Sequence, residues 1–364
     1  MATPSYTIAS LPPTQPVETV AVLRKATEAH RYLAELKGVA GTIPNERILV
    51  DTLSLQEAKD SSAIENIITT DDEIYRSDYL TLAFATPAAK EVHRYAEALK
   101  LGFEEVRRSG GIGTNTVLRV QARLEGSAGG LRKLPGTVLK NQRTGEVVYT
   151  PPQDHATIVE LMSNLEVFLN EDALMDADPL VKMAIAHHQF ESIHPFYDAN
   201  GRTGRIINIL YLVRCGLLDL PILYMSRHII RNKAEYYHLL QQVRIDGNWE
   251  PWILFVLEAI ARTAQESIAL VKEIRALMQQ YKQRLRSEQP RLYSQDLLNS
   301  LFRHPYTKID FMMRDMLVTR ITATRYLNLL VGMGLLQMVK VGRRNFYLNE
   351  KLFELLRAGT TSTP

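Results

Sequence analysis

The stretch from His194 to Arg205 contains residue types that can bind a phosphate and move a proton. The side-chain pKa of His194 can lie near neutrality, so it is a candidate general base for a hydroxyl that attacks phosphorus. Arg202 and Arg205 are three positions apart, and both can reach one anion with planar heads that hold several donors. Asp198 adds a carboxylate where magnesium can bridge carboxylate and phosphate oxygens. The spacing therefore predicts a phosphate site with a base at its edge.

Two helices are expected to position this stretch. Asp178 and Pro179 suit the start of a helix, and apolar residues then recur at helical spacing. Pro195 disfavours helical geometry at His194, so the first helix should end there. A second helix, apolar on one face, is expected to end before Gly216. Its first amides would be unpaired and point towards the loop, which makes its N-terminus an anion site.

The stretch resembles the motif of the Fic family, in which histidine, proline and phenylalanine precede an acidic residue, glycine, asparagine, glycine and two arginines. Every fixed position matches except Ala199, where the family has glycine. The resemblance implies transfer of AMP from ATP to a Ser, Thr or Tyr hydroxyl of a protein, which can be the enzyme itself. It implies that His194 is the base and that Asp198 holds magnesium. The residues that it implies for nucleotide and phosphate binding are Phe196, Ala199, Asn200, Gly201, Arg202, Thr203, Gly204 and Arg205.

Other interpretations of this stretch stay open. One is a helix-capping loop with solvated arginines. Another is a metal site formed by His187, His188, Glu191 and His194, although the HExxH order of zinc hydrolases is absent. We therefore expect His187 and His188 to be structural, one facing the core and one the surface. Removal of AMP from a modified protein, use of another donor, and a DNA-binding regulator that senses ATP are the remaining alternatives.

A second resemblance lies upstream of the motif. Ser61, Glu65 and Asn66 match the pattern of Fic proteins that hold themselves inactive, and we expect an inhibitory helix at about residues 57–70. If the Glu65 carboxylate pairs with Arg205, that arginine cannot orient the terminal phosphate of ATP. A nucleotide would then bind in the wrong position for in-line attack. The alternative is a glutamate on an exposed helix that has no such role.

Between residues 134 and 152 the spacing of apolar residues changes from helical to strand-like, which predicts short strands. Runs at 137–139 and 146–149 flank residues 141–145, whose composition is typical of a hairpin turn. The Fic family has a hairpin called the flap before its catalytic helices, and this segment resembles it in position. Such a flap can pair with a strand of a target protein and bring the acceptor hydroxyl near His194. A purely structural hairpin is the alternative.

The C-terminal part is basic, with nine lysines and arginines against three acidic residues at positions 291–348. Expected helices at 293–302, 307–316 and 322–333, followed by a hairpin, resemble a winged helix-turn-helix. DNA is the partner that this resemblance suggests, and a protein is the alternative. The candidate DNA contacts are Thr322, Thr324 and Arg325 on the third helix, and Lys340, Arg343 and Arg344 on the hairpin.

The composition fits a globular protein of two or three domains. The chain has 364 residues, of which 46% are hydrophobic and 23% charged, and its net charge is only +3. The single cysteine, Cys215, excludes a disulfide within the chain. We find no signal sequence and no uncharged apolar run of about 18 residues, so we expect no membrane contact and a cytoplasmic location. Apolar scaffold helices suggest a homodimer.

The expected fold class is mainly α, with a Fic-type helical domain, a β-hairpin flap and a C-terminal winged helix-turn-helix. An N-terminal helical region at 1–110 should contain the inhibitory helix. It should precede a catalytic domain at 111–265, a linker helix at 266–290 and a winged helix domain at 291–364.

Overall fold

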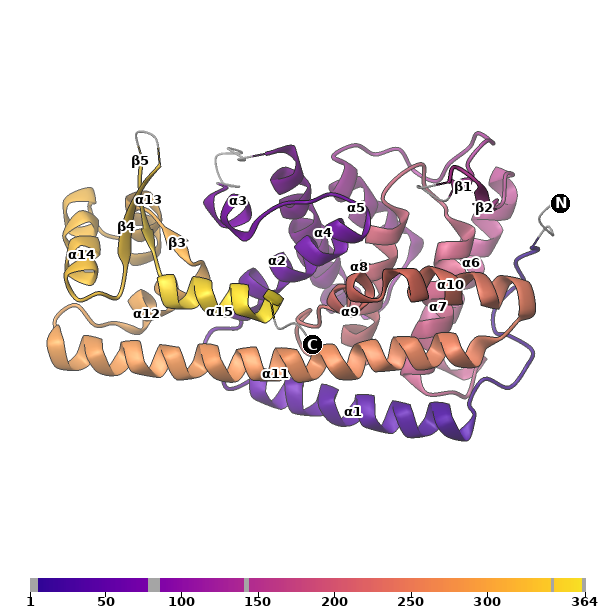
Figure 1. The fold of residues 1–364 in the computed structure, drawn as a ribbon, viewed down its shortest axis with the longest axis horizontal. Helices are drawn as coiled ribbons and strands as arrows, with labels where there is room; N and C mark the ends of the chain where they lie inside the picture. The colour runs from indigo at the N-terminus through magenta and orange to yellow at the C-terminus, as the bar shows by residue number, and fades with distance from the viewer. Residues whose placement is uncertain (1–5, 78–85, 141–143, 342–343, 362–364) are drawn as a thin grey trace.

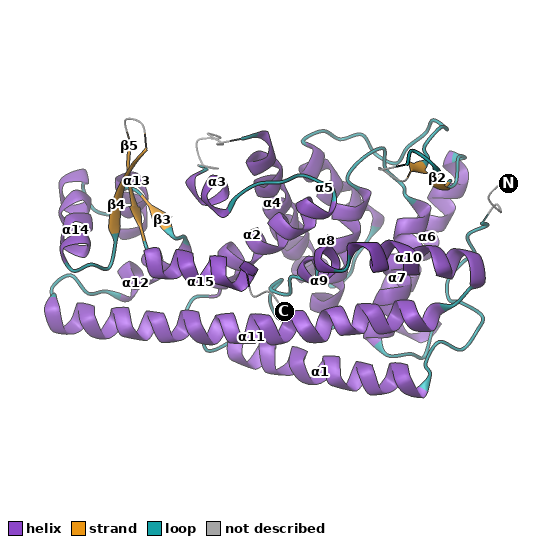
Figure 2. Cartoon of the chain, in the orientation of Figure 1, coloured by secondary structure: helices purple, strands orange, loops and turns teal. Residues whose placement is uncertain are grey.

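The computed structural model describes residues 6–77, 86–140, 144–341 and 344–361. Helices make up most of these ranges, and strands form one two-stranded and one three-stranded sheet (Figure 2). This confirms the expected mainly α fold class. In the described ranges we find no helix that is both long and apolar enough to cross a membrane.

Five helices form the N-terminal region, and the last four of them pack together through buried apolar faces. Their bounds are α1 Val20–Ala40, α2 Glu46–Ile64, α3 Asp71–Arg76, α4 Pro87–Ser109 and α5 Thr114–Glu125. Glu65 caps α2, and Asn66 then takes a left-handed conformation with φ 63°, so the helix cannot continue. The expected inhibitory helix at 57–70 is therefore wrong at its C-terminal end. The Asn66 side chain accepts a hydrogen bond from Nζ of Lys233 at 3.2 Å.

Two helices at the centre of the molecule position the motif, as the sequence predicts. Asp178 accepts a hydrogen bond from the amide of Leu180, and Pro179 occupies the first turn of α7. Every residue of α7 from Leu180 to Ile193 is buried, because α6, α8 and α11 pack around it. The elements of this part are α6 His155–Asn170, the short 3₁₀ helix η1 Asp172–Leu174, α7 Pro179–Ile193, α8 Asn200–Arg214, α9 Ser226–Arg231 and α10 Lys233–Asp246.

The longest element, α11 (Trp249–Glu288), runs along one side of the molecule and reaches both ends of it (Figure 1). Its 40 residues span about 60 Å at 1.5 Å per residue. Helix α1 packs along it. Near the end of α11, the Tyr281 hydroxyl donates to the carbonyl of Leu335 and contacts Oδ1 of Asn349 at 2.8 Å. These bonds fasten the C-terminal part of the chain to α11.

The predicted hairpin is present, but its strands are short. Strand β1 (Leu139–Lys140) pairs antiparallel with β2 (Val147–Tyr149), and the register shifts within β1. Residues 141–143 of the expected turn lie outside the described residues. The hairpin lies at the end of the molecule opposite the C-terminal sheet (Figure 1).

The C-terminal module comprises the described residues from Arg291 onwards. Its elements are α12 Gln295–Arg303, β3 Tyr306–Thr307, α13 Ile309–Met316, α14 Arg320–Gly332, β4 Gln337–Val341, β5 Arg344–Leu348 and α15 Glu350–Thr361, and the sheet order is β3-β5-β4. Up to β5, this order of helices and strands is typical of a winged helix. The expected helix at 307–316 is wrong at its start, because Thr307 pairs with Tyr347 in the sheet.

Candidate active site

The loop between α7 and α8 takes its shape from Asn200. Oδ1 of this side chain accepts a hydrogen bond from the amide of Phe196, and Nδ2 donates to the Phe196 carbonyl, both at 2.8 Å. His194 and Ala199 have φ angles of 49° and 63°, in the left-handed region that favours glycine. Ala199 thus adopts the backbone conformation that the family glycine would favour. Asn200 organises the loop, and its contact with phosphate stays a prediction.

A carboxylate lies at the N-terminal end of α8. Nη2 of Arg205 donates to Oε1 of Glu65 at 2.9 Å. Nε of Arg205 donates to Oγ of Ser61 at 2.8 Å, and Nη2 also donates to the Ser61 carbonyl at 2.9 Å. A Cβ atom on Gly201 would collide with Oε1 of Glu65, so glycine is required for this approach. The structure therefore brings the predicted inhibitory residues Ser61 and Glu65 onto the predicted phosphate site.

The Arg205 guanidinium is only 2% exposed. Burial opposes its charge, but the Glu65 carboxylate holds the pKa of Arg205 above its ordinary value. Burial also raises the pKa of Glu191 to about 7, although the Arg205 charge lowers it. Oε1 of Glu191 would lie 2.8 Å from a Cβ atom on Gly204. Gly204 therefore allows α8 to pack closely on α7.

Arg202 has different partners from Arg205. Nη1 lies 2.9 Å from Oε2 of Glu91 on α4, and Nη2 lies 3.3 Å from Oε1 of Glu125 on α5. The side chain is 4% exposed, so the interpretation of solvated arginines is wrong. The expectation that both arginines reach one anion is also not met here, because carboxylates of two neighbouring helices bind Arg202.

Asp198 is the candidate magnesium ligand. Its side chain is 75% exposed, and Oδ1 accepts a hydrogen bond from the amide of Ala199 at 2.6 Å. The described part of the chain contains no group of three or more His, Cys, Asp or Glu side chains that could hold a metal ion. One accessible carboxylate fits magnesium, which usually keeps several waters and binds substrate phosphates.

His194 is suited to accept a proton. Burial, followed by the positive charges of Arg132 and Arg244, lowers its pKa to about 4. The imidazole is therefore neutral at physiological pH. Nδ1 is buried, and no hydrogen-bond partner for it is found in the parts of the chain that the structure describes.

Arg132 holds the backbone around His194, and sequence reasoning missed it. This arginine is fully buried. Nε donates to the His194 carbonyl at 2.9 Å, and Nη2 donates to the carbonyls of Ile193 and Pro152. The Arg132 amide donates to the Pro195 carbonyl at 2.9 Å. All these partners are backbone atoms, so no residue type in the sequence could have indicated them.

Tyr197 connects the motif to the segment that leads into the flap. Its hydroxyl accepts hydrogen bonds from the amides of Lys133 and Leu134, each at 3.0 Å. On the other side of the hairpin, the Tyr149 hydroxyl donates to the Ser192 carbonyl at 2.8 Å. Both sides of the hairpin are therefore fixed to the α7–α8 region. Sequence reasoning did not single out either tyrosine.

The remaining motif side chains lie in the core. Phe196 and Thr203 are fully buried, and the Phe196 ring packs against Phe190. The prediction that one of His187 and His188 faces the surface is wrong, because helices enclose α7 on every side. His187 lies 2.9 Å from the hydroxyl of Tyr236, and His188 lies 3.2 Å from the carbonyl of Leu240.

The candidate DNA contacts are dispersed over the C-terminal module. Thr322, Thr324 and Arg325 lie on α14, and Lys340 is exposed on β4. Arg343 and the side chain of Arg344 lie outside the described part. Two apolar side chains near the start of α14 are strongly exposed, Leu317 at 91% and Ile321 at 84%.

Three family models match the sequence. The model described as Fic/DOC family N-terminal matches residues 23–104, and the Fic/DOC family model matches residues 112–212. The model of the protein adenylyltransferase SoFic-like C-terminal domain matches residues 277–352. These matches cover the α2 region, the motif and the C-terminal module.

Similar curated proteins match the chain over part of its length. Protein adenylyltransferase fic-1 of Caenorhabditis briggsae is 30% identical over 117 residues, which are 32% of this chain and 21% of that protein. Protein adenylyltransferase Fic of Culex quinquefasciatus is 35% identical over 103 residues, or 28% and 19% of the two chains. The matched region thus spans about a fifth of the length of these relatives.

Solved structures have the same fold. A Fic family protein from Desulfovibrio desulfuricans aligns with a TM-score of 0.58 at 20% identity, over 92% of this chain and 98% of the other. Fic-1 from C. elegans aligns with a TM-score of 0.51 at 19% identity, over 69% and 74%. At this level of identity, the likeness concerns the fold alone.

Proposed function

The chain belongs to the Fic/DOC family, and we propose that it is a nucleotidyltransferase that moves AMP from ATP to a Ser, Thr or Tyr hydroxyl of a protein. The main support is the position of Arg205 and Gly201 at the start of α8, one loop away from a neutral His194. The Glu65 carboxylate already occupies this place, which indicates that it suits an anion. The names of the curated relatives agree with this reaction.

The proposed reaction uses His194 as the base. The acceptor oxygen attacks the α-phosphorus of ATP while His194 accepts the hydroxyl proton, and a new oxygen–phosphorus bond forms. The bond between the α-phosphorus and the bridging oxygen to the β-phosphate breaks, and pyrophosphate leaves. Magnesium bound at Asp198 would neutralise phosphate charge. Arg205 and the first amides of α8 would hold the phosphates for in-line attack.

We expect the hairpin to bind the target protein. Strands β1 and β2 are short and largely exposed, and Tyr197 and Tyr149 fix both sides of the hairpin to the α7–α8 region. An extended target segment can pair with an exposed strand edge through backbone hydrogen bonds. This arrangement would bring the acceptor hydroxyl towards His194.

In the proposed regulation, Glu65 holds the activity low. Its carboxylate binds the Arg205 guanidinium that the terminal phosphates of ATP would need. The nucleotide would then bind with its phosphates misplaced. Glu65 is one-third exposed at the end of α2, so its side chain can leave while the helix stays.

Label transfer tests the proposed function. ATP labelled at the α or, separately, the γ phosphate is offered to wild type, Glu65→Gly, and Glu65→Gly combined with His194→Ala. We expect protein labelling from the α position alone, raised by Glu65→Gly and lost with His194→Ala. The matched control is Glu171→Gly, because Glu171 is also the C-cap of a helix and lies outside the site. Labelling from the γ position would instead establish kinase chemistry.

Nucleic acid is a second candidate partner, through the C-terminal module. The arginines Arg320 and Arg325 are exposed on α14, in a part of the chain that is rich in positive charge. The neighbouring exposed side chains Leu317 and Ile321 are more typical of a protein interface. Titration of a DNA duplex at rising salt concentration distinguishes a module that binds DNA from one that binds a protein. Binding to phosphates weakens steeply with salt, and Lys340→Ala should weaken it further.

A further inference from the structure

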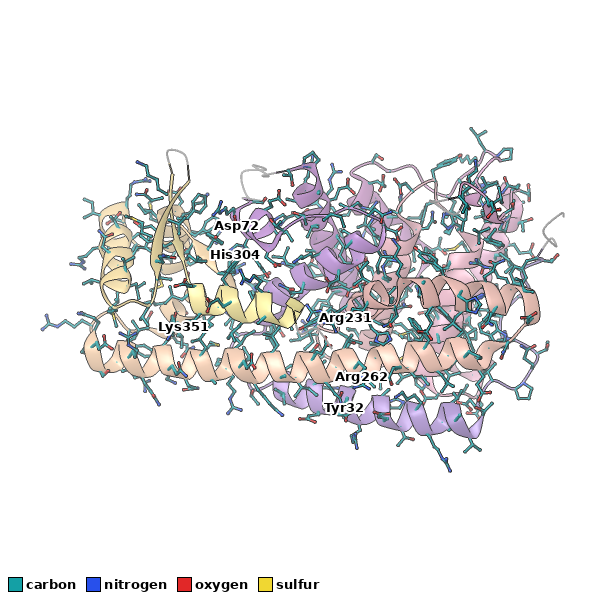
Figure 3. The ribbon with its side chains drawn as sticks, viewed as in Figure 1. Tyr32, Asp72, Arg231, Arg262, His304 and Lys351 are labelled. Atoms are coloured by element: carbon teal, nitrogen blue, oxygen red, sulfur yellow. The ribbon has the colours of Figure 1, made fainter. Side chains whose placement is uncertain are left out.

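The C-terminal module docks on the N-terminal helices through side chains of both parts. Nε of Arg303 on α12 donates to Oδ2 of Asp51 on α2 at 2.8 Å. The Tyr306 hydroxyl on β3 donates to Oδ1 of Asp72 on α3 at 2.7 Å. Figure 3 labels Asp72 of α3 and His304 of the module in the region where the two parts meet. Asp51 belongs to the same helix that ends at Glu65.

Tyr75 lies at the centre of this contact. It is buried, and its ring packs edge-on against His304 and Phe353 of the module, at centroid distances of 5.4 and 6.0 Å. Its hydroxyl accepts a hydrogen bond from Nε2 of Gln56 at 2.8 Å. Gln56 is a buried residue of α2. A continuous set of contacts therefore connects the module to α2.

Helix α2 is also fixed to α9. The buried Glu57 carboxylate accepts hydrogen bonds from the amide and the hydroxyl of Ser226, and Oδ2 of Asp60 lies 3.2 Å from Nε of Arg227. The module thus binds the first half of α2 at Asp51, and α9 binds the second half at Glu57 and Asp60. Ser61 and Glu65 project from the C-terminal end of α2 onto Arg205.

We infer that docking of the C-terminal module positions α2, so that the module sets how firmly Glu65 binds Arg205. This inference rests on the proposed function only where it concerns inhibition. Asp51 and Glu65 are fourteen positions apart, or about 21 Å along a helix, and a helix moves as a rigid element over that length. The Glu65–Arg205 bond of 2.9 Å tolerates little displacement. A partner that binds the undocked module better than the docked one would therefore release the site.

Hydrogen exchange tests the inference without relying on activity. The test variant combines Arg303→Ala with Tyr306→Phe, which removes two bonds across the contact and leaves the core of the module unchanged. We expect exchange in residues 58–66 to rise about fivefold. The matched control is Arg320→Ala, which breaks an arginine–aspartate pair with Asp310 inside the module. It should change exchange in this segment less than about twofold. Arg303→Lys retains the charge and should restore part of the protection.

Label transfer from ATP then tests the effect on Glu65. The double variant should raise labelling about fivefold in the presence of Glu65 and less than about twofold in a Glu65→Gly background, where nothing remains to be released. Unchanged exchange in residues 58–66 overturns the inference, whatever the labelling shows. If no variant labels protein, including Glu65→Gly, the proposed function fails and exchange still decides the inference. If the double variant does not fold, Arg303→Ala alone gives the same test, because it removes one of the two bonds across the contact.

Discussion

Oε1 of Glu65 lies 2.9 Å from Nη2 of Arg205, although 140 positions separate the two residues in the chain. The contact joins the end of α2 to the first turn of α8, where Gly201 leaves room for the carboxylate. A substrate phosphate and Glu65 would need the same donors. The relationship therefore connects a sequence that resembles the inhibitory pattern of Fic proteins to a specific arginine of the motif.

Gly201→Ala tests whether displacement of Glu65 is enough to activate the protein, or whether the phosphates also need the space beside Gly201. A Cβ atom here would collide with Oε1 of Glu65 and lie 2.9 Å from Nη1 of Arg205. The methyl group would displace Glu65 but also fill the place of the phosphates. We expect no activation by Gly201→Ala, and loss of at least about tenfold in nucleotide affinity even when combined with Glu65→Gly. Calorimetric titration with ATP measures this. Activation equal to that of Glu65→Gly would contradict the assignment of Gly201.

Arg132→Ala should destabilise the protein by about 3 kcal/mol, because the carbonyls of His194, Ile193 and Pro152 lose a buried charged donor. Urea unfolding measures the change. The control is Arg119→Ala, since Arg119 is exposed and pairs only at the surface with Glu105. Its effect should stay within about 0.5 kcal/mol. Similar effects of the two substitutions would mean that the buried arginine does not support the loop.

Tyr197→Phe should impair use of the protein target more than binding of ATP. The hydroxyl of Tyr197 is the acceptor for the amides of Lys133 and Leu134, so its loss frees the segment before the flap. We expect KM for the protein target to rise about fivefold, while the affinity for ATP changes less than about twofold. Tyr293→Phe, in the C-terminal module, is the control. If the affinity for ATP fell as much as KM for the protein target rose, Tyr197 would belong to the nucleotide site instead.

The lowered pKa of His194 predicts that activity falls only at a lower pH than it would with an ordinary histidine as the base. Burial and two nearby arginines bring this pKa to about 4, below the ordinary 6.5, so the base stays unprotonated through the mildly acidic range. In Glu65→Gly, the pH dependence of kcat/KM should show no loss assigned to His194 near pH 6.5 and a loss closer to pH 4. A limb centred at pH 6.5 would show that His194 titrates like a solvated side chain.

The lowered pKa of His194 also makes the free energy of unfolding depend on pH. Because the folded pKa is below the unfolded value, the unfolded state binds more protons between pH 6.5 and 4. The contribution of His194 to the free energy of unfolding is therefore complete above pH 6.5 and is lost as pH falls towards 4. His194→Gln should lower the difference in unfolding free energy between pH 7 and pH 5. An unchanged difference would contradict a buried neutral imidazole.

The local elements around the site could be predicted because their signals are local. Asp178 and Pro179 start a helix, and Pro195 follows its end, as capping and backbone sterics require. The turn-forming residues at 141–145 indicated a hairpin, although its strands are shorter than their apolar runs. Residue type alone could not predict that β3 occupies positions 306–307, since a two-residue strand depends on its partner β5.

The sequence by itself determined the chemistry of the site, because the motif places a histidine, an aspartate, a glycine and two arginines within twelve positions. It also determined the helices that hold them, through capping and apolar spacing. Only the tertiary structure decided which partners those side chains have. The bonds from Arg132 to backbone carbonyls, the contacts of Arg202 with Glu91 and Glu125, and the docking of the C-terminal module on α2 join distant segments. Such contacts depend on how helices pack, and local sequence patterns do not predict that arrangement.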